Sequence, residues 1–314
     1  MTRFLMLLEP HTTPIIEMPV VEIPTVEIKE SLFEQAGVRL LVKRLDLVHP
    51  IISGNKWYKL KYNLLAAHEQ GCKTLLSFGG AYSNHIHALA GAGSSYGFKT
   101  IGVIRGEAHT PLNDTLQFAV DQGMHLHYMS RADYRLKQTP ALIAQLRERY
   151  GDFYLVPEGG TNTLAVKGAK EIVDDLDDDV DLVACACGTG GTLAGVVAGL
   201  NGQCQALGVA VLKGASFLKD DVRRLLDETG HGGSTNWSIN LNYHFGGYAK
   251  TKPELLLFLK HFEQQHAIPL DPVYTVKLTY ALYAMIEAGE IARGTTVLAL
   301  HTGGLQGRMG FDLN

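Results

Sequence analysis

The sequence lacks the cysteine pattern of a disulfide-rich or zinc-binding protein. Its 314 residues include four cysteines, and no two of them form a C-x-x-C pair. Two of the four, Cys185 and Cys187, lie in an apolar run, which favours buried thiols. This usage is typical of a reducing compartment, so we expect a cytoplasmic protein.

An excess of positive charge is absent as well. The formal net charge is -4 at pH 7, so no basic footprint favours a nucleic-acid partner. Residues 1–8 hold one arginine and a short apolar run, without the longer apolar core and cleavage site of a signal peptide. We therefore expect neither nucleic-acid binding nor secretion.

The sequence also lacks an unbroken apolar helix of membrane-spanning length. Residues 182–200 carry no charge and would be long enough to cross a bilayer. However, Gly188, Gly190 and Gly191 interrupt the run, and such a loop would expose its backbone to lipid. We interpret the segment as a buried strand, a glycine loop and the start of a helix, and we expect no membrane partner.

The remaining composition is that of a globular protein, with 46% apolar and 19% charged residues. Hydrophobic patterns predict strands at 74–78, 100–104, 124–129, 153–156, 182–187, 206–212 and 295–300, and one strand or a pair within 38–48. They predict helices at 56–70, 84–96, 112–122, 132–150, 165–176, 192–200, 217–228, 253–265 and 276–288. Prolines in 10–28 favour an extended arm or edge strand there. Alternating strands and helices predict an α/β fold with parallel sheets covered on both faces.

One segment, S-G-N-K at 53–56, precedes the first long helical pattern. Lys56 falls in the first helical turn, where the positive end of the helix dipole disfavours an ammonium group. This position would lower the pKa of the amine, which is useful if Lys56 acts as an uncharged nucleophile. The alternative is a solvated surface lysine.

A glycine loop, C-G-T-G-G-T at 187–192, joins an apolar strand to a helix. Converging backbone N–H groups and the helix N-terminus make such a loop suitable for a phosphate, and Thr189 and Thr192 add hydroxyl donors. No Gly-Lys-Ser/Thr follows, and Leu193 replaces the third glycine of a dinucleotide fingerprint. A cofactor with a single phosphate remains; the alternative is a tight turn.

A second strand-to-helix connection reads G-G-A-Y-S-N-H-I-H at 79–87. Ser83 or Asn84 is a natural helix cap, and Ser83 with the helix N-terminus could instead bind a substrate carboxylate. His85 and His87 resemble a metal-ligand pair. Two-residue spacing does not share a helix face, and no third ligand is evident, so we predict no metal site.

Two later segments complete the pattern: D-P-V-Y-T-V-K at 271–277 opens a helix, and H-T-G-G at 301–304 follows the last strand. Open α/β sheets bind ligands beyond the carboxyl ends of their strands, where both segments are expected. A buried core tyrosine is the alternative for Tyr274, and a simple turn is the alternative for Thr302.

The order of these five segments resembles that of the tryptophan-synthase-β-like (fold-type II) enzymes, which use pyridoxal phosphate. Within them the chain resembles the D-cysteine desulfhydrase and 1-aminocyclopropane-1-carboxylate deaminase family, from about Pro24 onward. The resemblance implies two open, twisted, mostly parallel sheets flanked by helices. It also implies a small domain, 57–155, inserted in a large domain of 1–56 and 156–314, and a homodimer.

The resemblance further implies residue roles. Lys56 would hold the cofactor aldehyde as a Schiff base and later move the Cα proton of the substrate. Asn55 lies beside it, Asn84 would bond the phenolic oxygen of the cofactor ring, and Ser83 would bind the substrate carboxylate or assist proton transfer. The cofactor phosphate would be held by Gly188, Thr189, Gly190, Gly191 and Thr192.

Tyr274 and Tyr248 match the two active-site tyrosines of the family, and Thr302, with Thr275, would face the pyridine nitrogen. The deaminase branch has glutamate directly after the tyrosine of D-P-V-Y, where this chain has Thr275. The resemblance therefore favours β-elimination from D-cysteine or a related amino acid, giving pyruvate, ammonia and sulfide. A cyclopropane deaminase and a non-catalytic cofactor-binding protein are the alternatives.

Two departures from the family pattern bear on the substrate. His85 stands where glutamine is frequent, and Trp57 and Tyr58 follow Lys56 where a more polar pair is common. We expect both departures to lie near the cofactor and to influence which substrate is accepted.

Overall fold

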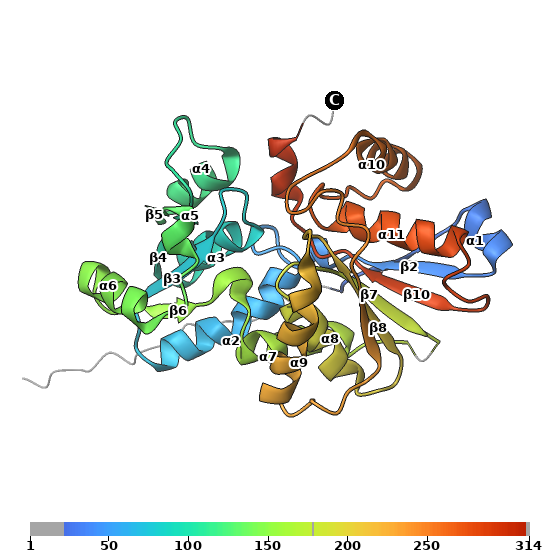
Figure 1. Ribbon diagram of the computed structural model, residues 1–314, viewed down its shortest axis with the longest axis horizontal. Coiled ribbons are helices and arrows are strands. Elements are labelled where there is room, and N and C mark those ends of the chain that lie inside the picture. Colours follow the sequence, from blue (N-terminus) through green and yellow to red (C-terminus); the bar gives the residue numbers. More distant parts are fainter. Residues whose placement is uncertain (1–21, 178, 312–314) are drawn as a thin grey trace, which may run out of the picture.

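The computed structural model describes residues 22–177 and 179–311 (Figure 1). Its strands form a six-stranded sheet in the order β1-β2-β10-β7-β8-β9 and a four-stranded sheet in the order β5-β4-β3-β6. Only the β1–β2 pair is antiparallel among the described strands. The prediction of two mostly parallel sheets is confirmed.

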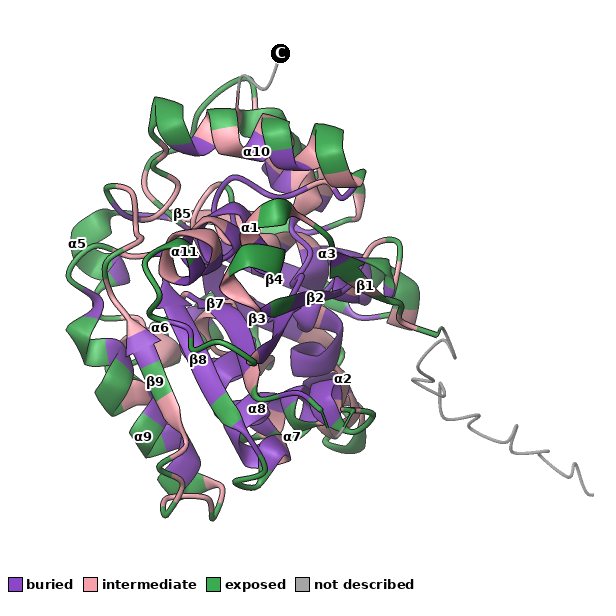
Figure 2. Ribbon diagram, turned by 90° about the vertical axis from the view of Figure 1, so that its right-hand side faces the viewer, coloured by how far each residue is buried: buried purple, intermediate pink, exposed green. Residues whose placement is uncertain are grey.

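The larger sheet consists of β1 (Thr25–Ile28), β2 (Arg39–Lys43), β7 (Leu182–Cys187), β8 (Gln205–Ala210), β9 (Trp237–Asn240) and β10 (Thr296–Leu300). Its central strands are buried along nearly their whole length (Figure 2). Strands covered by helices on both faces need apolar residues at every position, which explains why these segments read as continuous apolar runs.

The smaller sheet consists of β3 (Thr74–Gly79), β4 (Lys99–Arg105), β5 (His125–Met129) and β6 (Tyr154–Val156). The helices are α1 (Ser31–Ala36), α2 (Asn55–Glu69), α3 (Asn84–Tyr96), α4 (Asp114–Asp121), α5 (Arg131–Tyr134), α6 (Pro140–Tyr150), α7 (Thr163–Lys170), α8 (Gly191–Leu200), α9 (Leu218–Glu228), α10 (Pro253–His266) and α11 (Thr275–Glu287). In Figure 1 the smaller sheet with α3 to α6 lies to one side of the larger sheet, and α2 runs below and between them.

Most predicted elements match the structure to within one or two residues, but two helix predictions are wrong. The expected helix 132–150 is divided into α5 and α6, because Pro140 begins α6 and Thr139 caps it. Of the two alternatives for 38–48, the structure has a single strand, β2, which is shorter than the segment and is followed by a 3-10 turn at Leu45–Leu47. The expected helix 165–176 ends at Lys170 and continues as a 3-10 turn, Glu171–Val173.

Of the two edge strands of the larger sheet, the sequence predicted one. The predicted edge strand within 10–28 is present as β1, which pairs with β2, whereas residues 10–21 lie outside the described part. At the opposite edge, β9 was not predicted, because W-S-I-N is too short for a clear periodicity. None of the described helices has the length and hydropathy needed to cross a membrane.

Helix α2 packs closely on α7, which follows the smaller sheet in the chain. A Cβ atom at Gly168 would lie 1.9 Å from the carbonyl oxygen of Tyr58, so only glycine allows this approach of the two helices. The contact ties α2, which carries Lys56 in its first turn, to α7. The division into 57–155 and the remainder stays a prediction.

We predict that Gly168→Ala lowers the free energy of unfolding by about 1–3 kcal/mol, because a methyl group there would push α7 away from α2. Urea denaturation would measure the change. Gly233→Ala is the matched control, because a Cβ atom there meets nothing within 4 Å. Equal stability of the two variants would show that the helices separate without cost.

Candidate active site

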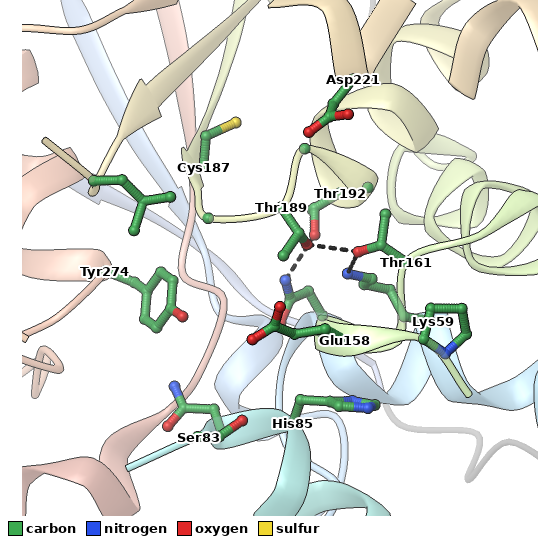
Figure 3. A pocket seen from close by; sticks show the side chains of 18 of the residues that line it. Lys59, Ser83, His85, Glu158, Thr161, Cys187, Thr189, Thr192, Asp221 and Tyr274 are labelled. Carbon is green, nitrogen blue, oxygen red and sulfur yellow. Dashed lines mark hydrogen bonds between the residues drawn. The ribbon is translucent and has the colours of Figure 1, made fainter. Parts of the chain in front are cut away.

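A cavity of about 420 Å³ opens where strands of both sheets end. Its wall includes Gly80 after β3, Arg105 at the end of β4, Pro157 after β6 and Gly188 after β7. This is where open α/β sheets bind ligands. Twelve of the predicted site residues line it: Asn55, Lys56, Ser83, Asn84, Gly188, Thr189, Gly190, Gly191, Thr192, Tyr248, Tyr274 and Thr302. Figure 3 shows several of these side chains around the cavity.

The residues that begin α2 pack against the segment that follows β10. Gly54 has φ +67°, and a Cβ atom there would lie 1.9 Å from the carbonyl oxygen of Thr302. Asn55 Nδ2 donates to Thr192 Oγ1 at 2.7 Å, and Lys56 Nζ donates to Asn55 Oδ1 at 3.1 Å. Asn55 therefore links the lysine to the glycine loop, and three of the predicted segments meet at one point.

The structure excludes the alternative interpretation of Lys56 as a solvated surface lysine. Burial lowers the pKa of its amine to about 8, and the negative charge of Asp271 opposes this shift. The direction agrees with the expectation from the sequence, but burial is the main cause in place of the helix dipole. A sizeable fraction of the amine is therefore neutral near physiological pH.

The glycine loop forms an uncapped helix N-terminus. Helix α8 begins after Gly190, whose φ is +76°, and no side chain caps it, whereas Ser83 caps α3 and Asn162 caps α7. The first N–H groups of a helix have no partner within it, so those of α8 remain open to a ligand. A side chain at Gly188 would approach the Tyr274 ring, at 3.1 Å from Cε1. These features fit an anion such as a phosphate.

Lys59 is a site residue that the sequence analysis missed. Its side chain is 2% exposed, and its Nζ donates to Thr161 Oγ1 at 2.8 Å (Figure 3). Thr161 Oγ1 lies 2.5 Å from Thr189 Oγ1 in the glycine loop. Burial, together with the charge of Lys56, holds the pKa of Lys59 well below its usual value. The spacing i, i+3 from Lys56 places both amines on one helix face, a signal that could have identified it.

His85 also lines the cavity and is 2% exposed. Its Nε2 lies 2.8 Å from Ser77 Oγ, which in turn donates to the Pro157 carbonyl at 3.3 Å. Its Nδ1 has no hydrogen-bond partner among the described residues. Burial, Lys56 and Lys59 hold the pKa of His85 well below its usual value, so the ring is neutral. His85 therefore lies in the same cavity wall as Lys56 and Lys59, and its expected place near the cofactor stays a prediction.

His87, the other half of the possible metal pair, stacks on Phe118 with ring centres 3.8 Å apart. Within the described residues, no group of three or more histidine, cysteine or acidic side chains is placed to hold a metal ion. The two histidines have separate surroundings.

Tyr248 and Tyr274 both line the cavity and pack edge to face, with ring centres 6.1 Å apart and planes at 72°. Burial raises the pKa of both phenols, so both are protonated at neutral pH. Tyr248 lies in a loop with unusual backbone geometry, because Phe245 and Ala249 both have φ of 51°. Such a conformation needs support from its surroundings.

Lys277 supplies that support. Its side chain is fully buried, and its ammonium donates to the carbonyl groups of His244 at 2.9 Å, Gly247 at 2.7 Å and Val211 at 3.4 Å. Burial lowers its pKa to about 8, and Asp271 opposes the shift. Lys277 lies in α11, which begins directly after Tyr274, and its hydrogen bonds hold the loop that carries Tyr248.

Thr275 lies outside the cavity wall, and the expectation that it faces the cofactor ring is wrong. Its hydroxyl donates to Asp271 Oδ2 at 2.8 Å, and Asp271 also accepts from the backbone N–H groups of Val273, Tyr274 and Thr275. The hydroxyl is therefore engaged in starting α11. Thr302 lines the cavity as expected.

Trp57 and Tyr58 do not line the cavity either, so their expected place near the cofactor is wrong. Both are buried in the core, and Trp57 stacks on His49 with ring centres 5.5 Å apart. The helical turn points them away from the face that carries Lys56 and Lys59.

The outer wall has charged residues that the sequence analysis did not single out. Glu158 accepts a hydrogen bond from the Tyr134 hydroxyl at 2.8 Å and pairs with Lys137 at 3.3 Å. Arg105 Nη2 lies 3.9 Å from where a Cβ of Gly80 would be, above the loop that leads to Ser83. The guanidinium therefore adds positive potential beside the proposed carboxylate site.

Fold and cavity together define a class of protein, the pyridoxal-phosphate-dependent enzymes. The family model described as "Pyridoxal-phosphate dependent enzyme" matches residues 12–303, and the chain belongs to this family. Within it, the chain is a fold-type II member of the 1-aminocyclopropane-1-carboxylate deaminase and D-cysteine desulfhydrase family.

The similar proteins support this narrower placement. A Thermotoga maritima protein, provisionally named a 1-aminocyclopropane-1-carboxylate deaminase, is 32% identical over 88% of this chain and 92% of its own. An Arabidopsis thaliana protein, named a mitochondrial bifunctional D-cysteine desulfhydrase/1-aminocyclopropane-1-carboxylate deaminase, is 30% identical over 86% of this chain and 73% of its own. A crystal structure of an ACC deaminase homologue superimposes with a TM-score of 0.80 at 27% identity, covering 95% of this chain and 94% of that one.

We predict that the rate at which cofactor-free protein binds pyridoxal phosphate rises with pH and levels off above about pH 8. Only a neutral amine can attack an aldehyde, and the pKa of the Lys56 amine, the predicted Schiff-base lysine, is lowered to about 8. Stopped-flow absorbance across pH 6–10 would measure the rate. A rate that still rises tenfold per pH unit above pH 9 would contradict a lowered pKa.

We predict that Lys277→Met lowers kcat at least tenfold while the cofactor still binds, because the Tyr248 loop loses two hydrogen bonds from the ammonium group, at His244 and Gly247, and Val211 after β8 loses a third. Stability should fall by about 3 kcal/mol, since hydrogen bonds to charged groups are the stronger kind. Steady-state kinetics and urea denaturation would measure both. The exposed Lys250→Met is the matched control, and identical behaviour of the two variants would exclude the supporting role.

Proposed function

We propose that this enzyme is a lyase that removes the β-substituent of D-cysteine or a related amino acid. With one water consumed, D-cysteine would give pyruvate, ammonia and sulfide. The observation that carries the proposal is Thr275, which stands where the deaminase pattern has glutamate and whose hydroxyl is bonded to Asp271. A thiolate is a good leaving group, so elimination tolerates a cofactor ring that has only a neutral group such as Thr302 beside it.

The cavity suits pyridoxal phosphate. We propose that the open N–H groups of α8, with Thr189 and Thr192, hold the phosphate, and that Lys59 balances its charge. Lys56 would hold the aldehyde end, with Asn55 fixing its position. When bound, the cofactor supplies the electron sink that stabilises a carbanion at the substrate Cα.

The substrate carboxylate would lie at the start of α3. There, Ser83 and the helix N-terminus offer donors, and the Arg105 guanidinium beside Gly80 adds attraction. The Lys56 amine, neutral in part because of its lowered pKa, would then take the Cα proton. Because Tyr274 and Tyr248 remain protonated, either hydroxyl can donate a hydrogen bond to the departing sulfur.

The second candidate is the cyclopropane deaminase, which the names of several relatives favour. Opening an unactivated ring places a greater demand on the electron sink, and position 275 provides no carboxylate here. A non-catalytic cofactor-binding protein is a weaker alternative, because phosphate binding alone would need neither the paired tyrosines nor a lysine with lowered pKa. A homodimer and a cytoplasmic location also remain proposals.

We predict that the cofactor-loaded protein releases pyruvate and sulfide in equal amounts from D-cysteine and at least tenfold less keto acid from 1-aminocyclopropane-1-carboxylate. Chromatography of the keto acids separates the three-carbon product from the four-carbon one. The reverse preference would identify the deaminase. Absence of turnover with either compound, with cofactor bound, would favour the non-catalytic protein.

Lys56→Ala is the matching variant, with Lys250→Ala as the control. Borohydride reduction should attach the cofactor covalently to the wild-type chain and to the control but not to Lys56→Ala. Attachment at another lysine would overturn the role of Lys56 while leaving cofactor binding intact.

A further inference from the structure

The side chain of Asn84 is contacted by a residue 222 positions later in the chain. Gln306 Nε2 donates a hydrogen bond to Asn84 Oδ1 at 2.7 Å. Asn84 begins α3 next to the smaller sheet, whereas Gln306 lies in the 3-10 turn η5 (Leu305–Gly310). Asn84 lines the cavity and Gln306 does not, so the glutamine acts from behind.

This hydrogen bond determines which end of the Asn84 amide is available. An amide group has one accepting oxygen and one donating nitrogen. Because Gln306 occupies Oδ1, the Nδ2 donor remains for a ligand in the cavity. A glutamine amide at position 306 can donate to Asn84 in this way, whereas a carboxylate can only accept.

Two glycines enclose the same amide. A Cβ atom at Gly304 would lie 2.2 Å from Asn84 Nδ2, and one at Gly307 would lie 3.6 Å from Asn84 Oδ1. The chain after β10 therefore passes close over the Asn84 side chain. The amide has little room to move away from this place, although its nitrogen and oxygen ends, which are similar in size, can exchange positions.

The turn that carries Gln306 is itself anchored. Arg308 pairs with Glu263 of α10, with Nη2 3.0 Å from Oε2, and also donates to the Leu270 carbonyl. The Gly307 N–H donates to the Gly304 carbonyl at 2.9 Å. Gln306 thus projects from a fixed turn, and its contact connects the body of the larger sheet to α3.

We propose that Gln306 is a positioning residue, which directs the Asn84 Nδ2 donor to an oxygen of the bound cofactor. The inference rests on the proposed contact of Asn84 with the cofactor. It makes the C-terminal turn a part of the cofactor site, although no atom of that turn needs to touch the cofactor.

The test compares Gln306→Glu, Gln306→Met, Asn84→Ala and the double variant Asn84→Ala/Gln306→Glu. Pyridoxal phosphate is titrated into each cofactor-free protein, and both the Kd and the absorbance maximum of the bound cofactor are recorded. A glutamate would turn the Asn84 nitrogen toward itself and leave the oxygen facing the cavity. Gln203→Glu is the control, because Gln203 is exposed beyond the far end of α8.

We expect Gln306→Glu to raise the Kd at least tenfold and to shift the absorbance maximum in the same direction as Asn84→Ala. Gln306→Met, which has similar size and no donor, should raise the Kd about threefold. In the Asn84→Ala background, Gln306→Glu should have no further effect, because the group that it misdirects is gone. A purely electrostatic effect of the new carboxylate would persist in that background and would overturn the proposal.

The two assumptions fail in different ways. If Asn84→Ala binds the cofactor like the wild type, the contact of Asn84 is wrong and the inference falls with it. If Asn84→Ala weakens binding while both Gln306 variants bind normally, the Asn84 contact stands and the role of Gln306 is wrong. Should Gln306→Glu fail to fold, Gln306→Met with its double variant decides between these outcomes.

Discussion

The burial of positive charge in one cavity constrains the rest of this structure. Lys56 and Lys59 lie on one face of α2, and the N-termini of α3 and α8 open into the same space. Placing ammonium groups in such surroundings costs free energy, and the lowered pKa values of both lysines reflect that cost. An anion with a single phosphate would offset much of it, so cofactor binding and the stability of the cavity should be coupled.

The carboxylate of Asp271 partly compensates the positive charge of the buried lysines. It raises the pKa of Lys56 and of Lys277 while burial lowers both. Its own oxygens are fully occupied, because they accept three backbone N–H groups and the Thr275 hydroxyl. A carboxylate fixed in this way contributes its charge at a distance and cannot move into the cavity to act as a base. This agrees with the proposal that the Lys56 amine, and not Asp271, accepts the Cα proton.

Much of the fold could be predicted because its signals are local. Strands such as β7 are continuous apolar runs, and the glycine loop after it is recognisable from six residues. The prediction of secondary structure failed where one residue ends a helix or where a strand is very short. Pro140 divides α5 from α6 through a single residue, and β9 is too short to show periodicity.

The same distinction applies to the site. Lys56, Ser83 and Tyr274 were identified because each stands in a motif, and all of them line the cavity. Lys59 and Glu158 carry no motif of their own, and the cavity is what brings them together. Conversely, Trp57 is adjacent to Lys56 in sequence but points into the core, because neighbouring residues on a helix face different directions.

Position 275 shows how one residue can influence both folding and chemistry. A threonine is short enough to return its hydroxyl to Asp271 and complete the start of α11. A glutamate there would bring a second carboxylate against Asp271, so its side chain would have to turn elsewhere to avoid the like charge. The preceding residue, Tyr274, lies in the cavity wall, whereas Thr275 does not. In the proposed elimination, the threonine that completes the start of α11 therefore leaves the cofactor ring without a carboxylate from position 275.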